Sequence, residues 1–198
     1  MREISPSVNL SCEEFYKTLL PQSQAIVDRI RSEKNAGNRP MPSTRLADYS
    51  LLLNENLRRG LLDKVASLVD ENLAGRSEMC IQFALLISHA LGYIGLPSRV
   101  AVGIATYYNA DGHELFNWEH AWIRVGKEVI DGNVDCLFEN PMVPPTVNIF
   151  PYWGPIAETP TDRNLRENRN RTAPPDSDVS EIWWPELQEW LKNNINFL

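Results

Sequence analysis

The sequence predicts an α+β fold, and three observations support this prediction. Residues 1–74 consist mainly of segments in which apolar residues recur at helical spacing. Residues 79–93, MCIQFALLISHALGY, form a mostly apolar run that is long enough for a buried helix and is followed by Gly-Leu-Pro. Residues 98–108 carry the β-branched and aromatic side chains typical of a strand, and a hairpin pattern follows at 120–135. We therefore expect helices packed against a sheet.

The N-terminal part, residues 1–74, is expected to be helical and to belong to the same domain as the core. The expected helices cover residues 13–20, 22–34, 44–59 and 61–75, with a loop at 35–43. The third helix is predicted from four residues at helical spacing: Leu46, Tyr49, Leu53 and Leu57. Gly60 is expected to end it, because glycine is a poor helix former.

The composition changes after the hairpin. Residues 139–160 are rich in proline and aromatic side chains, and we expect them to pack irregularly or to roof a cleft. Residues 161–179 have almost no apolar content and are expected to form a mobile polar segment. Residues 180–198 recover helical spacing and are expected to form a C-terminal helix that docks on the rest. The core of the fold is thereby assigned to residues 75–160.

Charge and composition restrict the partners. The formal net charge of -7 argues against a nucleic-acid partner, which would require a basic face. No apolar run reaches transmembrane length, and the first residues lack the pattern of a signal peptide, so we expect no membrane partner and a cytoplasmic location. The three cysteines, Cys12, Cys80 and Cys136, are widely spread without a CxxC pair. This spacing predicts neither a disulfide framework nor a zinc site, and we expect no metal or other cofactor.

Cys80 is the candidate nucleophile because it lies where the apolar helix is expected to begin. The unpaired N–H groups and the positive end of the helix dipole would stabilise a thiolate there. The alternative is that Cys80 simply packs, as most buried cysteines do. A nucleophilic thiol also needs a base. His89 is about half a turn out of phase with Cys80 on the same helix, and His113 lies in a loop sequence, so His120 is the remaining histidine.

The hairpin pattern indicates which side chains lie near His120. A two-residue loop at 126–127 places His120 opposite Asn133, with Asp131 and Asp135 as diagonal neighbours on the same face. A carboxylate hydrogen-bonded to one imidazole nitrogen would orient the ring and leave the other nitrogen for a thiol. The alternative is a solvated polar face, and a register slip of one residue would reverse the arrangement.

Four short motifs together resemble the transglutaminase-like family. They are Cys-Ile-Gln-Phe-Ala at 80–84, Gly-Leu-Pro-Ser-Arg at 95–99 followed by Gly103, His-Ala-Trp at 120–122, and Val-Ile-Asp at 129–131. The resemblance covers about residues 75–135 and is similar in order and spacing to the core of small bacterial members. It implies a papain-like α+β fold, in which a helix carrying the thiol packs on an antiparallel sheet carrying the histidine and the aspartate.

The resemblance assigns a role to each matching residue. Cys80 would be the nucleophile, His120 the general base and acid, and Asp131 the orienting carboxylate. Glu78 departs from the family, which often has glycine there, and a carboxylate so close would raise the thiol pKa unless it points away. The Cys80 backbone N–H is a plausible oxyanion donor, and Asn72 is a candidate side chain for the same role.

The resemblance implies a cysteine enzyme that acts on amide bonds through a thioester. Water as acceptor gives a peptidase, amidase or deamidase, which we favour, whereas an amine gives a transglutaminase or an amine acyltransferase. The substrate would be a protein, a peptide or a small amide or amine. The alternative from another class is an inactive member that serves as a protein-binding module.

Overall fold

The computed structural model describes residues 21–70, 75–144 and 146–195. The chain divides into two compact units, Met1–Arg39 and Pro40–Leu198, each of which is treated by itself. In the first unit the described residues contain helix α2 (Pro21–Ala36), which begins at Pro21. The helix expected at 13–20 lies outside the described residues.

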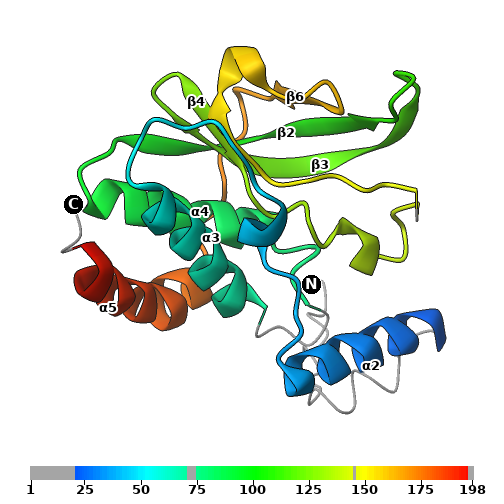
Figure 1. The fold of residues 1–198 in the computed structure, drawn as a ribbon, viewed down its shortest axis with the longest axis horizontal. Helices are drawn as coiled ribbons and strands as arrows, with labels where there is room; N and C mark the ends of the chain where they lie inside the picture. The colour runs from blue at the N-terminus through cyan, green and yellow to red at the C-terminus, as the bar shows by residue number, and fades with distance from the viewer. Residues whose placement is uncertain (1–20, 71–74, 145, 196–198) are drawn as a thin grey trace, which may run out of the picture. The chain divides into compact units, whose positions relative to one another are not determined.

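The second unit has α+β architecture around a curled, mixed sheet (Figure 1). The strands follow the order β1-β5-β4-β3-β2-β6. Their bounds are β1 (Ala47–Asp48), β2 (Ser98–Tyr108), β3 (Glu114–Val125), β4 (Glu128–Asp131), β5 (Tyr152–Pro155) and β6 (Arg163–Glu167). The short β1 pairs in parallel with β5, whereas the other neighbours are antiparallel. The long β2–β3 pair therefore forms the centre of the fold.

The described residues of this unit also form the α-helices α3 (Glu55–Val69), α4 (Cys80–Tyr93) and α5 (Trp184–Asn194). Helix α4 packs against β2 and β3, while α3 and α5 pack against α4 (Figure 1). Apolar side chains of α4, including Phe83, Leu86 and Ile87, are fully buried in the main core. Burial of such a helix against the sheet stabilises it more than its own propensity does, so the start of α4 is held firmly over the sheet.

Several expectations from the sequence are confirmed. The apolar run forms α4, with Met79 at its N-cap, and residues 98–108 form β2. The C-terminal helix docks through buried Leu187 and Leu191 and has proline in its first turn. In the described residues no helix is both long and apolar enough to cross a membrane.

The helix expected at 44–59 is wrong. Residues 42–45 form a 3-10 turn and β1 follows, because the backbone of Ala47 is hydrogen-bonded to the β5 region instead of to its own segment. Helix α3 begins only after Asn54, whose side chain accepts the Asn56 N–H as an N-cap. Gly60 lies inside α3, where a Cβ atom would come within 3.2 Å of the Trp190 ring. Close packing of α5 therefore accounts for this glycine.

The proline-rich and polar segments after the hairpin also contain strands. Strand β5 lies within the stretch expected to be irregular, and β6 lies within residues 161–179, which we expected to be mobile. Strand β6 pairs with β2 over five residues, from Gly103↔Glu167 to Tyr107↔Arg163. Its one buried residue, Arg163, is held by ion pairing, which a hydropathy pattern does not report.

Candidate active site

Cys80 is the first residue of α4, as the sequence predicted. It is only 8% exposed, and its helix has neither a side-chain cap at Met79 nor an acidic residue in the first turn. The first-turn N–H groups and the helix dipole therefore act on the sulfur without competition from a capping carboxylate.

His120 and Asp131 meet across the β3–β4 hairpin. The two-residue turn predicted at 126–127 is present, with Gly126 at φ 57°, and Val125 pairs with Glu128. This register puts Asp131 diagonally opposite His120 on the same face. His120 Nε2 lies 2.8 Å from Asp131 Oδ1, and both side chains are fully buried. The sequence-predicted pairing of these two residues is therefore present in the structure.

The electrostatics of this pair favour a charged imidazole. Burial by itself would lower the pKa of His120, but the Asp131 carboxylate, followed by the Cys80 side chain, raises it to about 10. Burial conversely would raise the pKa of Asp131, but its contacts with His120 and Arg163 lower it. An imidazolium beside an ionised Asp131 is consequently the stable form of the pair at neutral pH.

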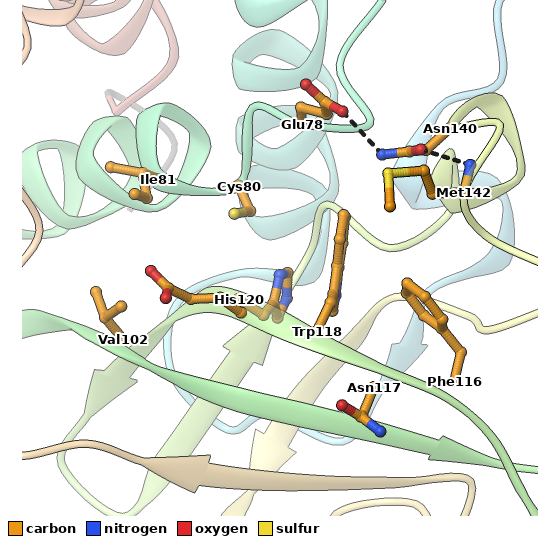
Figure 2. A pocket seen from close by; sticks show the side chains of 11 residues that line it. Glu78, Cys80, Ile81, Val102, Phe116, Asn117, Trp118, His120, Asn140 and Met142 are labelled. Atoms are coloured by element: carbon orange, nitrogen blue, oxygen red, sulfur yellow. Dashed lines mark hydrogen bonds between the residues drawn. The ribbon is translucent and has the colours of Figure 1, made fainter.

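Cys80 and His120 line one cleft of about 430 Å³ (Figure 2). The Cys80 side chain points from the start of α4 towards β3, where the His120 ring lies. His120 Nδ1 is buried and has no hydrogen-bond partner of normal geometry among the described residues, and Cys80 is the neighbouring side chain that supports its protonation. The other lining residues are Glu78, Ile81, Val102, Phe116, Asn117, Trp118, Glu119, Asn140 and Met142.

Two tryptophans hold the His120 ring in place. The Trp118 ring stacks on the imidazole, with 5.9 Å between the ring centroids and an interplanar angle of 13°. The Trp122 ring, two residues after His120, also stacks on it, with 6.2 Å between the centroids. Trp122 is 1% exposed and belongs to the core. The imidazole is thus restrained by ring packing as well as by its hydrogen bond to Asp131.

Glu78 is turned away from the thiol. Its carboxylate accepts a hydrogen bond of 2.9 Å from the Asn140 side chain, and Figure 2 shows it directed along the rim, whereas the Cys80 sulfur points to the cleft floor. Asn140 is held in turn by the backbone N–H of Met142. Glu78 therefore contributes negative charge to the cleft mouth instead of facing the sulfur directly.

The two other candidates for the orienting carboxylate are occupied elsewhere. Asn133 donates its side-chain amide to the Arg76 carbonyl oxygen at 2.7 Å. Asp135 accepts from the Arg76 guanidinium at 2.5 Å. Both are buried in a cluster that ties the chain before α4 to the chain after β4. Among these candidates the structure brings Asp131 to His120.

Arg163 is a site residue that sequence reasoning missed. Its Nη1 donates to Asp131 Oδ2 at 2.7 Å, and its side chain is 1% exposed. It lies in residues 161–179, which we expected to form a mobile polar segment. Local hydropathy offers no signal for this contact, because the buried residue of β6 is itself charged and its partner lies 32 positions earlier.

The remaining candidates lie apart from this cluster. His89 packs edge-on against the Trp184 ring, and burial lowers its pKa. His113 is exposed in the β2–β3 turn. Arg99 pairs with Glu167. Asn72 lies outside the described residues.

No group of three or more metal-binding side chains occurs in the described parts of the chain. The polar atoms that converge in the cleft are instead a sulfur, an imidazole and, behind it, a carboxylate, which is the set required for nucleophilic catalysis by a thiol. Comparisons of the chain with protein-family models, curated proteins and solved structures found no match. The interpretation of the site therefore rests on its own geometry and chemistry.

Proposed function

We propose that the protein is a cysteine-dependent acyl-transfer enzyme with a transglutaminase-like, papain-like core. The observation that carries the proposal is the position of His120, which bonds Asp131 through Nε2 and lies beside Cys80 in one cleft. A buried imidazole held between a carboxylate and a thiol is the arrangement that activates a cysteine nucleophile. The motif resemblance at 80–84, 95–99, 120–122 and 129–131 supports the same assignment.

The proposed reaction begins with the Cys80 proton on His120, giving a thiolate and an imidazolium. The sulfur attacks the carbonyl carbon of an amide, a C–S bond forms, and the carbonyl π electrons move to the oxygen. The N–H groups of the first turn of α4 stabilise that oxyanion. When the carbonyl re-forms, the C–N bond breaks, His120 protonates the leaving amine, and a thioester remains on Cys80.

The second half of the proposed reaction releases the acyl group. His120 takes a proton from water as the water oxygen attacks the thioester carbon. The C–S bond then breaks, the acid departs, and the sulfur leaves as the thiolate with the proton on His120, as at the start. An amine could replace water, but hydrolysis is the reaction we propose, because the chain resembles the small bacterial members of the family.

Trapping of the acyl-enzyme tests this proposal. The protein is mixed with a library of peptide amides and activated esters, and its intact mass is measured at short times. We expect a mass increase equal to the acyl group, located on Cys80 by peptide mapping and abolished in Cys80→Ser. Decay in water, with or without added amines, then distinguishes hydrolysis from transfer. Failure of every acyl donor to label Cys80, although the protein is folded, would contradict the proposal.

A further inference from the structure

Arg163 connects β6 to the carboxylate behind the imidazole. Asp131 uses one oxygen for each neighbour: Oδ1 lies 2.8 Å from His120 Nε2, and Oδ2 accepts from Arg163 Nη1 at 2.7 Å. All three side chains are at most 1% exposed. The Asp131 carboxylate is consequently held at both ends, with no rotation left that keeps both bonds.

Arg163 is itself fixed by contacts on its other side. Its Nη2 donates to the Phe150 carbonyl oxygen at 2.5 Å, and its Nε donates to Asp162 Oδ1 at 2.8 Å. The planar guanidinium therefore bridges the chain before β5, residue 162 and the end of β4. A group anchored at three points transmits its position to Asp131 more precisely than a flexible cation could.

The geometry points to a positioning role for Arg163: it fixes Asp131, and through Asp131 it sets the orientation of the His120 ring towards Cys80. This inference rests on the proposed function, because it concerns the reactivity of the Cys80 thiol. Without Arg163, a buried carboxylate would keep one charged neighbour in place of two and would be free to rotate about its Cβ–Cγ bond. Misplacement of a reacting group by about 1 Å can cost about a hundredfold in rate.

The charge of Arg163 also acts on the Asp131 carboxyl itself. Burial would raise the pKa of that carboxyl, but its contacts with His120 and Arg163 lower it. Arg163 therefore helps to keep Asp131 ionised beside the imidazole, as well as fixing its orientation.

Alkylation of Cys80 by iodoacetamide tests the inference without a known substrate. Rates are measured by peptide mapping at one pH and well below the unfolding temperature of every variant. Arg163→Met removes both the charge and the bond to Asp131, and we expect a ten- to hundredfold slower reaction of Cys80. Arg163→Lys keeps a charged donor within reach of Asp131 but loses the planar contacts, and we expect it to recover most of the rate.

Two control variants separate positioning from general stability. Arg166→Met removes an exposed arginine of the same strand, and Asp135→Asn breaks a buried ion pair with Arg76 that includes neither Arg163 nor Asp131. Both are expected to leave the Cys80 rate within about twofold of the original protein, whatever they do to the thermal midpoint. If Arg163 had a merely structural role, the Cys80 rate would instead fall in every variant in proportion to that variant's loss of stability.

The outcomes for Arg163 and for the proposed function are distinguishable. If Cys80 reacts rapidly in the original protein and slowly in His120→Ala, but Arg163→Met keeps the original rate, the positioning role is wrong and the enzyme proposal stands. If Cys80 is no more reactive than Cys136 in the original, folded protein, the proposed function itself fails. A Cys80 alkylation rate that is mostly retained in Arg163→Lys but lost in Arg163→Met supports the inference.

Discussion

His120 Nε2 and Asp131 Oδ1 lie 2.8 Å apart in a buried contact across the β3–β4 hairpin, eleven positions apart in the chain. The contact orients the imidazole so that Nδ1 is left for the thiol side of the cleft. In a dry site such a pair stabilises the imidazolium strongly, because little solvent competes for either partner. The reactivity and the stability of the protein should both depend on it.

Replacement of Asp131 by asparagine tests the orienting carboxylate. The amide in Asp131→Asn would be neutral and would not support the imidazolium, so we expect the Cys80 alkylation rate to fall by about a hundredfold. The variant also leaves Arg163 buried beside a neutral group, at a cost of about 3–5 kcal/mol in unfolding free energy. Asp135→Asn is the matched control: it breaks a buried pair with Arg76 and should lower stability while the Cys80 rate stays near its original value.

The raised pKa of His120 predicts a pH-dependent stability, best measured in Cys80→Ser, where the thiol does not titrate. Asp131, the main cause of the raised pKa, is still present there. In Cys80→Ser the Asp131 carboxylate still raises the pKa of folded His120 above the 6.5 of the unfolded side chain, without the part that Cys80 contributes in the original protein. The stabilisation is therefore complete below about pH 6.5 and is lost as pH rises through the folded pKa, at up to about 1.4 kcal/mol per unit.

Urea unfolding of Cys80→Ser at pH 6 and pH 9 measures this loss. We expect the unfolding free energy to fall between the two values, and the fall to be much smaller in Cys80→Ser/His120→Gln. Equal pH dependence in the two variants would show that His120 titrates normally in the folded protein.

Gly103 accommodates the close approach of β6 to β2. A Cβ atom there would lie 2.1 Å from the Arg166 carbonyl oxygen and 2.8 Å from the Glu167 Cα atom, both of which are backbone. We expect Gly103→Ala to displace β6 and to lower the unfolding free energy by about 1–3 kcal/mol. Gly92→Ala, on open space in α4, should not destabilise, and chemical unfolding of both variants checks the contrast.

The carboxylates at the rim predict charge selectivity for reagents that enter the cleft. Glu78 and Glu119 are exposed lining residues, and Glu119 pairs with Arg171 at the surface. We expect a cationic methanethiosulfonate to modify Cys80 faster than an anionic one. Glu78→Gln should reduce this ratio by about fivefold or less, since exposed charges contribute about 1 kcal/mol or less.

Glu181→Gln serves as the control for charge selectivity, because it removes the same charge at an exposed position outside the cleft lining. The ratio of cationic to anionic rates should be unaffected by this variant. Equal effects of the Glu78 and Glu181 substitutions would mean that net charge, and not the cleft rim, sets the selectivity.

The elements that local patterns determine could be predicted from the sequence. Helix α4 and strand β2 follow from hydropathy and side-chain shape, and the two-residue turn at Gly126 sets the β3–β4 register that brings Asp131 to His120. The hairpin pattern alone did not choose among Asp131, Asn133 and Asp135, whereas the resemblance assigned Asp131. The contacts that hold Asn133 and Asp135 elsewhere involve Arg76, which lies 59 positions before Asp135.

The parts that could not be predicted depend on contacts between distant segments. Gly60 has the local signal of a helix break but lies inside α3, where a Cβ atom would come within 3.2 Å of the Trp190 ring. Arg163 has the local signal of a solvated segment but is buried by its ion pair with Asp131. In both cases the deciding partner lies far away in the chain, so no window of sequence contains the cause.

The most direct test of the central claim is the rate of Cys80 alkylation in the original protein and in His120→Ala, with Cys12 and Cys136 as internal references. The account predicts that at neutral pH Cys80 reacts faster than both references, and that His120→Ala slows it by about a hundredfold while the references are unchanged. A Cys80 that reacts at the same rate with and without the His120 imidazole would contradict the account, because the thiol would then not be activated by the site.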